Sequence, residues 1–179
     1  AARKAARPVL EQRIAQGKQA YLDESASVRT KDSTPLRPER VMQSLDARLT
    51  PDSIVVSDAS YSSIWTANYL TALKAGMRFL TPRGMAGIGW GFPMALGAKA
   101  ARPDAKVFCV VGDGGFGHVW SELETMLRES LPVTLIVLNN QILGYQKHGE
   151  NAKFSAHTRA VDFKPVDHAA IAAACGVRG

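Results

Sequence analysis

Short apolar runs alternate with helical patterns along most of this chain. Four of these runs have a length typical of strands, and they cover 54–57, 78–81, 106–111 and 133–138. Between them, apolar residues recur at the spacing of amphipathic helices, as Val41, Leu45 and Leu49 do. Because strands and helices alternate without hairpin signals, the pattern predicts an α/β fold. We expect a three-layer, doubly wound, mostly parallel sheet with helices on both faces.

The same pattern predicts where the helices and loops lie. Helices are expected over 1–24, 39–49, 64–73, 90–102, 116–130 and 166–175. The segment 25–37, rich in Ser, Thr and Pro, predicts a linker; the polar segment 139–154 predicts an ordered loop. Val177 is expected to begin another strand. We therefore divide the chain into an N-terminal helix and interdomain linker (1–37) and one domain (38–179) that is incomplete at its C-terminus.

The most informative stretch is residues 107–117, where an apolar run ends abruptly in a glycine-rich turn. Asp113 lies within this turn, and a helical pattern follows it. Glycines let backbone N–H groups approach an anion closely, and the start of a helix adds a partial positive charge. A strand, a glycine turn and a helix in this order therefore predict a phosphate-binding site.

The same turn also matches the dinucleotide-binding motif G-x-G-x-x-G, at Gly112, Gly114 and Gly117. Two features oppose that interpretation. Asp113 would repel a bare diphosphate unless a cation lay between them. The next apolar run ends in the amides of 139–140, where a dinucleotide site needs an acid for the ribose. One carboxylate, one side-chain amide oxygen and a diphosphate are instead suitable oxygen ligands for Mg²⁺.

The spacing of these residues resembles a known cofactor motif. Gly112-Asp113-Gly114, followed after 24 residues by Asn139-Asn140, is similar to the motif of thiamine diphosphate-dependent enzymes. Upstream, the segment 84–93 (Gly-Met-Ala-Gly-Ile-Gly-Trp-Gly-Phe-Pro) resembles the loop under the thiamine rings in the acetolactate synthase-like branch. The resemblance covers roughly residues 38–176. It implies thiamine diphosphate and Mg²⁺ as cofactors, while no residue points to FAD, which a full-length enzyme could bind elsewhere.

The resemblance also implies roles for single residues. Asp113 and Asn140 would coordinate Mg²⁺ through side-chain oxygens, and Ile142 would do so through its backbone carbonyl. Ala86 would accept a hydrogen bond from the 4′-amino group of the cofactor, and Ile88 would support the bent conformation that brings this group to C2 of the thiazolium ring. The residues expected to contact the cofactor are Ser60, Tyr61, Ser62, Ala86, Ile88, Gly112, Gly114, Gly115, Asn140 and Leu143.

Several of these positions keep a second interpretation. Asp58, Ser60 and Ser62 have side chains that could simply cap the next helix. Met85 and Trp90 are large and apolar, so they could pack either around the cofactor or in the core. Ile88 could likewise be an ordinary core residue.

The resemblance implies a reaction for the full-length enzyme, which would decarboxylate a 2-oxo acid such as pyruvate and transfer the resulting carbanion to an acceptor. A 2-oxo acid decarboxylase or an acyl-CoA lyase remains an alternative. The reason is that the segment 141–148 (Gln-Ile-Leu-Gly-Tyr-Gln-Lys-His) lacks the tryptophan-containing continuation of biosynthetic acetolactate synthases. Tyr145 and His148 in this segment could face the substrate. A non-catalytic dinucleotide-binding module is the alternative from another class.

One catalytic component is missing from the chain. The family needs a glutamate against the pyrimidine of the cofactor, and none of the glutamates in this sequence is placed to supply it. The resemblance implies that this glutamate comes from the pyrimidine-binding domain of a partner subunit, in a homo-oligomer such as a dimer or tetramer. We therefore expect the 179-residue chain to be inactive alone.

Composition narrows the class of protein. A hydrophobic content of 46% with 21% charged residues is typical of a globular protein. The formal charge of +6 comes partly from a basic N-terminal stretch without interleaved aromatic residues, so we expect a solvated helix face and no nucleic-acid partner. No apolar run approaches the roughly 20 residues that cross a bilayer, and no leader is present. Cys109 and Cys175 lack metal-ligand spacing, which indicates a reducing compartment, the cytoplasm.

Overall fold

The structure, a computed structural model, describes residues 2–179, with side chains from Lys4 onward. The chain divides into two compact units, Ala1–Ala47 and Arg48–Gly179. The first unit holds α1 (Ala2–Thr30) and α2 (Pro38–Asp46). Helix α1 continues past the predicted end at residue 24, and residue 1 of the prediction lies outside the described residues. Helix α2 begins at Pro38, one residue before the predicted range, and ends at Asp46, three residues before the predicted end at Leu49. Proline suits the first position because a first-turn N–H has no helical partner to lose.

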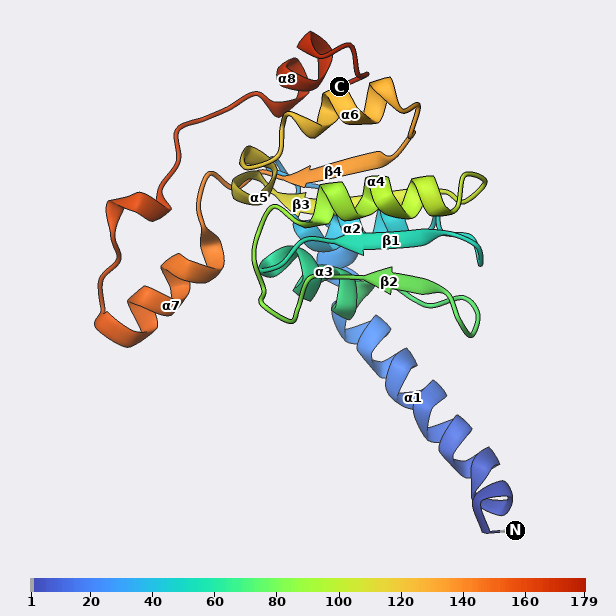
Figure 1. The fold of residues 1–179 in the computed structure, drawn as a ribbon. Coiled ribbons are helices and arrows are strands. Elements are labelled where there is room, and N and C mark those ends of the chain that lie inside the picture. The colour runs from blue at the N-terminus through green and yellow to red at the C-terminus, as the bar shows by residue number, and fades with distance from the viewer. Residues whose placement is uncertain (1) are drawn as a thin grey trace. The chain divides into compact units, whose positions relative to one another are not determined.

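The second unit is built on a parallel four-stranded sheet (Figure 1). Its strands are β1 (Ile54–Ser57), β2 (Arg78–Leu80), β3 (Val107–Gly112) and β4 (Thr134–Leu138). They lie in the order β2-β1-β3-β4, and all three neighbouring pairs are parallel. From β1 the chain first adds β2 on one side. It then crosses to β3 on the other side of β1 and continues outward to β4. The switch point of this α/β sheet therefore lies between β1 and β3.

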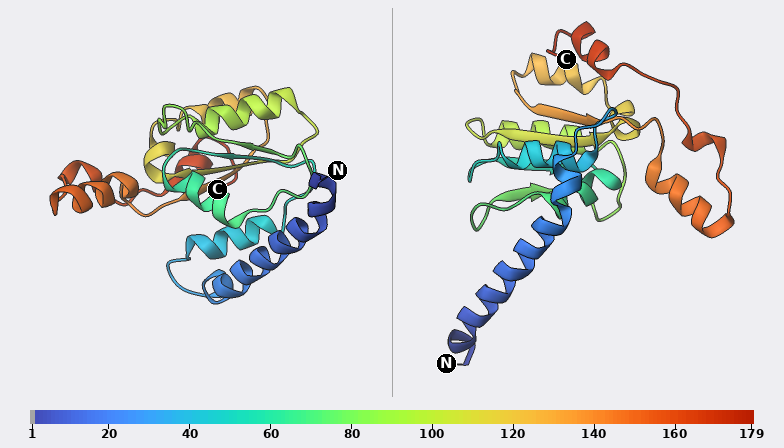
Figure 2. Two further views of the ribbon diagram at one scale, coloured as in Figure 1. Left: turned by 90° about the horizontal axis from the view of Figure 1, so that it is seen from below. Right: turned by 180° about the vertical axis from the view of Figure 1, so that it is seen from behind.

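Helices cover both faces of the sheet, so the predicted three-layer, doubly wound architecture is confirmed. Helix α3 (Tyr61–Tyr69) lies on one face, and α4 (Gly91–Ala101) and α6 (Glu122–Arg128) lie on the other (Figure 2). The remaining elements are α5 (Asp113–Gly117), α7 (Gly144–Phe154), the 3-10 helix η1 (Arg159–Val161) and α8 (His168–Ala174).

The central strands are apolar on both sides because both faces of the sheet are covered. On the side of α4, the β3 residues Cys109 and Val111 belong to one buried cluster with Phe92 and Phe116. Burial, and after it the negative charge of Asp58, raises the pKa of the Cys109 thiol. This cysteine is therefore a packing residue, and both cysteines of the chain are free thiols.

Two long segments differ from the prediction. The helix expected over 116–130 is two helices, since α5 begins at Asp113 directly after β3 and the chain turns at 118–121 before α6. The turn keeps Leu123 of α6 in the core, which made the two helices look continuous in the sequence. The loop expected over 139–154 contains α7, whose only buried residue is Gly144. A helix that buries almost nothing has no apolar stripe by which the sequence could reveal it.

Two shorter differences have local causes. Helix α3 ends at Tyr69 and does not reach Leu73, because Leu70 adopts an extended conformation. The strand expected from Val177 does not form over 177–179. Gly176 has a φ of +87°, which closes α8 as predicted and turns the following residues back toward Ala169.

Candidate cofactor site

Four loops meet at the carboxyl edge of the sheet, toward which the strand arrows point in Figure 1. They follow β1, β2, β3 and β4 and cover 58–60, 81–90, 112–117 and 139–143, and the third of these segments contains the short helix α5. We call residues 84–90 the ring loop and residues 112–117 the glycine turn. Ligands of open α/β sheets bind at this edge, next to the switch point. All the predicted site residues lie on these loops or on the first turns of the helices that follow them.

Asp113 begins α5, and its carboxylate is directed toward the turn after β4. Its Oδ2 accepts a hydrogen bond from the backbone N–H of Gln141 at 2.7 Å. The residue is only 6% exposed, and burial raises the pKa of its carboxyl group, while the N–H donors of Gly114 and Gln141 oppose the rise. The ion pairs of the described residues do not include Asp113. An acid that is held by amide donors and belongs to none of these ion pairs is suited to bind a cation.

The turn after β4 carries the other two predicted metal ligands, Asn140 and Ile142. Gln141 between them has a φ of +59°, and Oδ1 of Asn140 accepts a hydrogen bond from the N–H of Ile142 at 3.3 Å. An isolated antiparallel bridge pairs Ile142 with Asp162. The hydrogen bonds of this bridge use the carbonyl of Gln141 and the amide of Leu143, so they do not engage the carbonyl of Ile142.

These oxygens are of the kind that Mg²⁺ binds. Mg²⁺ takes one or two protein carboxylates together with phosphate oxygens and water, and does not need a cage of acids. Accordingly, no group of three or more His, Cys, Asp or Glu side chains suited to a metal occurs among the residues that the structure describes. The hydrogen bond from the Gln141 N–H joins the Asp113 carboxylate to the turn that carries the amide of Asn140 and the carbonyl of Ile142. The residues present therefore fit the predicted ion.

At Gly114 and Gly115 the glycine turn has room for backbone only. A Cβ at Gly114 would lie 2.6 Å from Cδ2 of Leu143, and a Cβ at Gly115 would lie 2.1 Å from Oδ2 of Asp58. A Cβ at Gly117 would meet nothing within 4 Å. The third glycine of G-x-G-x-x-G is thus not needed for close packing here, as it is in a dinucleotide site. The contacts bring the predicted residues Gly114 and Leu143 together, and they place Gly115 on Asp58.

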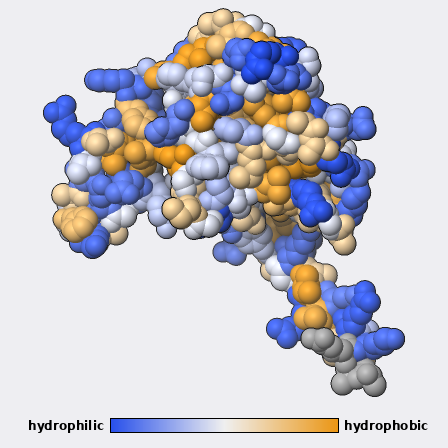
Figure 3. Space-filling view, in the orientation of Figure 1, coloured by the Kyte–Doolittle hydropathy of each residue, from blue (hydrophilic) through white to orange (hydrophobic). Residues whose placement is uncertain are grey.

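Tyr61, the first residue of α3, connects this helix to α7. Its ring lies beside Gly144, where a Cβ would be 3.2 Å away, and its hydroxyl is 2.6 Å from Nδ1 of His148. The ring of Tyr145 meets it edge-on with centroids 5.6 Å apart. Helix α7 and η1 form an arm beyond the strand ends, on which orange residues lie among blue ones at the left of Figure 3. Tyr61 and His148 are therefore brought together at the base of this arm.

The two serines on either side of Tyr61 have different environments. Ser60 is the N-cap residue of α3 and has a φ of +70°, but its side chain makes no capping hydrogen bond. Ser62 is buried, and its Oγ lies 3.9 Å from where a Cβ of Gly112 would be. The capping interpretation is wrong for Ser60, and Ser62 lies beside the glycine turn.

The ring loop presents its large side chains away from the core. Met85 is 98% exposed and Trp90 is 65% exposed, so the core interpretation is wrong for both. Ala86 has a φ of +56°, and its N–H donates to the carbonyl of Pro82 at 3.0 Å. Ile88 is half-buried and lies outside the buried core cluster. Apolar side chains in this position are open to a ligand or to another chain.

Asp58 has a role that the sequence did not predict. It is 1% exposed, and its Oδ2 and Oδ1 accept hydrogen bonds from the backbone N–H groups of Gly89 (2.8 Å) and Gly91 (3.1 Å). It does hold a helix start, but that of α4, not that of the next helix, α3. Its partners lie more than thirty residues away in the chain, so no local pattern reveals them. The one sequence signal for this role was an acid at the end of a strand, in a chain that also has a glycine-rich loop with N–H groups to donate.

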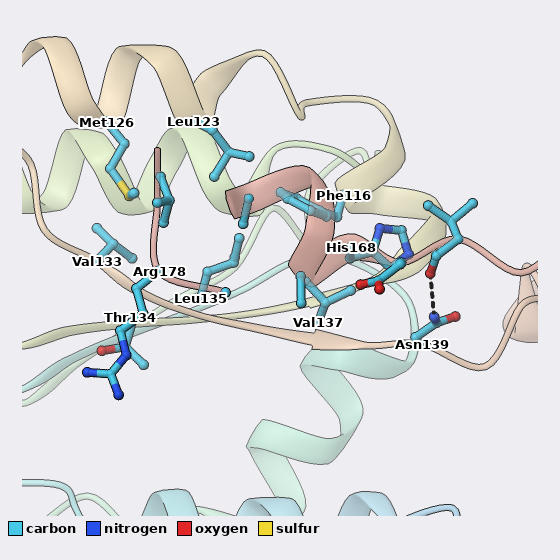
Figure 4. Close-up of a pocket in the computed structure, with 16 residues that line it drawn as sticks. Phe116, Leu123, Met126, Val133, Thr134, Leu135, Val137, Asn139, His168 and Arg178 are labelled. Carbon is cyan, nitrogen blue, oxygen red and sulfur yellow. Dashed lines mark hydrogen bonds between the residues drawn. The ribbon is translucent and has the colours of Figure 1, made fainter. Parts of the chain in front are cut away.

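A separate cavity of about 730 Å³ lies beside β4, between α6 and α8 (Figure 4). Its walls are mostly apolar, and His168 at its side meets the ring of Phe116 edge-on, with centroids 5.6 Å apart. Asn139 lies at its end and donates a hydrogen bond to the carbonyl of Val166. None of the predicted cofactor or metal residues lines this cavity. It is therefore not part of the candidate site.

Residues 58–179 match a model of known proteins described as "Thiamine pyrophosphate enzyme, C-terminal TPP binding domain". The probable acetolactate synthase large subunit of Methanococcus aeolicus is 31% identical over 137 residues, which cover 74% of this chain and 23% of that protein. The 2-hydroxyacyl-CoA lyase 2 of Bos taurus is 39% identical over 105 residues, 59% of this chain and 16% of that protein.

A solved structure agrees with these sequence matches. The thiamine diphosphate-dependent 4-hydroxybenzoylformate decarboxylase of Rhodococcus jostii RHA1 is 27% identical, with a TM-score of 0.73 over 80% of this chain and 27% of that chain. The chain spans about a quarter of the length of acetolactate synthase subunits that it matches. None of the helices in the described part of the chain has the length and hydrophobicity needed to cross a bilayer.

Proposed function

Since this chain belongs to the thiamine pyrophosphate enzymes, we propose that its second unit holds the diphosphate end of thiamine diphosphate through Mg²⁺. The observation that carries this proposal is the hydrogen bond from the Gln141 N–H to Asp113 Oδ2. It joins the glycine turn after β3 to the amide-containing turn after β4. Asp113 is buried and belongs to none of the ion pairs among the described residues, which supports its assignment as the acid that would meet the cation.

The residues of both turns have distinct tasks in this proposal. Asp113, Asn140 and the carbonyl of Ile142 would hold the ion. The backbone of Gly114 and Gly115 would approach the diphosphate, because glycine allows N–H groups to come close to an anion. The positive end of α5 is adjacent, although the helix is short. A carboxylate in this position repels phosphate without a cation, so the proposal requires binding to depend on Mg²⁺.

The ring end of the cofactor would lie over the ring loop. Ile88 would support the bent conformation, the carbonyl of Ala86 would accept a hydrogen bond from the 4′-amino group, and Ser60, Tyr61 and Ser62 would line the side formed by the loop after β1. When bound, the cofactor supplies the nucleophilic carbon and the electron-accepting ring that decarboxylation of a 2-oxo acid needs.

For the whole protein we propose decarboxylation of a 2-oxo acid, such as pyruvate, with transfer of the product unit to an acceptor. The likeness to acetolactate synthase subunits supports this reaction. The likeness to a 2-hydroxyacyl-CoA lyase and to a decarboxylase supports a second candidate, cleavage without transfer. In both, a pyrimidine-binding domain of a partner subunit in a homo-oligomer would supply the activating glutamate, so the chain alone should lack activity.

Calorimetric titration of the chain with thiamine diphosphate tests the proposal. We expect binding in the presence of Mg²⁺, loss of binding in EDTA, and loss of binding in Asp113→Ala. Asp104→Ala is the matched control, because Asp104 is an exposed acid in the turn before β3, at the opposite edge of the sheet. Binding of NAD that needs no metal and survives Asp113→Ala would contradict the proposal and favour the dinucleotide module.

A further inference from the structure

We propose that Asp58 is a positioning residue that fixes the ring loop against the glycine turn, and so sets the distance between the two halves of the cofactor site. The inference rests on the proposed function, because it assigns one half to the rings and the other to the diphosphate. It concerns a residue that would touch neither. Asp58 would act only through the backbone that it holds.

The contacts of Asp58 reach three elements at the switch point. Its backbone N–H donates to the carbonyl of Val110 at 2.8 Å, which fixes it to β3. Its two carboxylate oxygens accept the N–H groups of Gly89 and Gly91, at 2.8 and 3.1 Å. Both oxygens are thus used, one on the ring loop and one on the first residue of α4.

The glycine turn is pressed against the same carboxylate. A Cβ at Gly115 would lie 2.1 Å from Oδ2 of Asp58, and a Cβ at Gly91 would lie 2.9 Å from its Cα. Gly89 has a φ of +89°, and a Cβ there would be 3.0 Å from Cβ of His118. Gly91 and Gly115 therefore pack on Asp58 without space for a methyl group, and Gly89, whose N–H Asp58 holds, is similarly crowded by His118. Such tight packing transmits the position of one loop directly to the other.

The buried charge of Asp58 makes it costly for the ring loop to leave this position. The carboxylate of Asp58 is fully buried, and the ion pairs of the described residues do not include it. Its negative charge is felt at Cys109, whose thiol pKa it helps to raise. The two N–H groups and the positive end of α4 stabilise it, and the N-cap residue of α4, Trp90, makes no side-chain cap of its own. The ring loop therefore cannot move away without leaving a buried charge unsatisfied.

Positions 88 and 89 show why this matters for a ligand. Ile88, which would support the bent cofactor, directly precedes Gly89, whose N–H Asp58 holds. Gly115, which would approach the diphosphate, is the glycine that packs on the same oxygen. A displacement of about 1 Å at one of these points is enough to weaken binding of a ligand that must span both, by about 10- to 100-fold. A ligand that touches only the glycine turn would not sense it.

Two ligands separate these effects. Thiamine diphosphate spans both halves, whereas inorganic pyrophosphate reaches the glycine turn only. In calorimetric titrations with Mg²⁺, we expect Asp58→Asn to weaken thiamine diphosphate about 10-fold or more and to leave pyrophosphate within about 2-fold. Asp104→Asn should change neither. An equal loss for both ligands, or no loss for either, would overturn the proposal.

Amide NMR spectra give a readout that needs no cofactor. The amide protons of Gly89 and Gly91 should shift upfield in Asp58→Asn and exchange faster with solvent, because an amide NH₂ cannot accept the bond that an oxygen accepted. Unchanged signals would overturn the role of Asp58 even if binding fell. If Asp58→Asn does not fold, Gly91→Ala is used in its place, because it disturbs the same contact. The loss of thiamine diphosphate affinity relative to the loss of pyrophosphate affinity then tests the proposal in the same way. Failure of both ligands to bind the unmodified chain would overturn the proposed function, while the glycine signals would still report whether Asp58 fixes the loop.

Discussion

Two aspartates follow neighbouring strands at the same edge of the sheet, and their surroundings differ. Asp58 follows β1 and gives both carboxylate oxygens to backbone N–H groups of the ring loop and α4. Asp113 follows β3, and its side chain receives one N–H from the turn after β4. Both are buried, and the ion pairs of the described residues include neither. Burial alone therefore does not distinguish an acid that could bind a ligand from one that holds the fold together. The two are distinguished by which elements supply their hydrogen-bond donors.

The register of the sheet explains part of this difference. Ser57 pairs with Val110, so β3 continues for two residues beyond the end of β1 before its acid appears. Asp58 therefore lies beneath the loops, and Asp113 lies nearer to their tips. An acid beneath the loops can organise them, while an acid at the tips can meet a ligand.

Replacement of Asp113 should have the largest effect on binding. Asp113→Asn removes the charge that would hold Mg²⁺, so thiamine diphosphate affinity in Mg²⁺ should fall about 100-fold or more, since even outer partners of metal ligands are worth 10- to 100-fold. The same variant should not reduce the stability of the chain without ligand. Calorimetric titration and urea unfolding check the two parts. A destabilised Asp113→Asn chain would mean that Asp113, like Asp58, is structural.

The pH dependence of this variant follows from the raised pKa of Asp113. The folded chain holds this proton more tightly than the unfolded chain, so the part of the stability that comes from this group is lost as pH rises from the unfolded pKa to the folded pKa. Asparagine stays neutral throughout. The stability difference between Asp113→Asn and the unmodified chain should therefore be near zero at pH 3 and grow in favour of the variant as pH approaches 7. Urea unfolding at several pH values in EDTA measures it, and a difference of opposite sign would show that Asp113 is stabilised as an anion.

Asp58→Asn should behave in the opposite way. One hydrogen bond to a charged acceptor is lost and a donor is placed against a donor, so the free energy of unfolding should fall by about 2–3 kcal/mol without any ligand. Asp104→Asn, on an exposed acid, should change it by less than about 0.5 kcal/mol. Urea unfolding by circular dichroism compares them. Equal stability of all three chains would remove the distinction between the two buried aspartates.

Glycine substitutions test how tightly the glycine turn meets Asp58. Gly115→Ala places a methyl group against Oδ2 of Asp58 and should cost about 1–3 kcal/mol of stability. Gly97→Ala is the matched control, since a Cβ at Gly97, inside α4, meets nothing within 4 Å. That change should stabilise the chain by about 0.5–1 kcal/mol. Thermal unfolding should show a lower melting temperature for Gly115→Ala and a higher one for Gly97→Ala. An unchanged melting temperature for Gly115→Ala would mean that the glycine turn can shift to make room for the methyl group.

The sequence predicted the sheet better than the helices. All four strands were located, because strands buried on both faces are continuous apolar runs such as 107–111. The break between α5 and α6 was missed, because a helical pattern follows the glycine turn directly in the sequence, although the chain turns at 118–121 between the two helices. Helix α7 was missed because a helix that packs on almost nothing needs no apolar face.

Prediction of the site was limited in the same physical way. The motif around Asp113 and Asn140 indicated two turns that the structure does bring together, through the amide of Gln141. Their ligand roles remain predictions. The role of Asp58 was missed because its neighbours in sequence suggest a cap for α3, whereas its partners come from another loop. Hydrogen bonds between distant loops leave no periodic pattern in a single sequence.

The arm at the same edge provides the smallest expected effect. The ring of Tyr61 touches Gly144, and its hydroxyl pairs with His148, so this pair connects the body of the unit to α7. Tyr61→Phe keeps the ring and removes only the hydrogen bond, which is worth about 0.5–1 kcal/mol at a partly exposed position. Amide hydrogen exchange should become about 2- to 5-fold faster in 145–152, because opening of the arm depends on that free energy, and should stay unchanged in β1 and β3. Tyr69→Phe, on α3 but away from the arm, is the control. Faster exchange throughout the sheet would mean that Tyr61 supports the fold as a whole, which would place the loop after β1 with Asp58 among the residues that organise this edge.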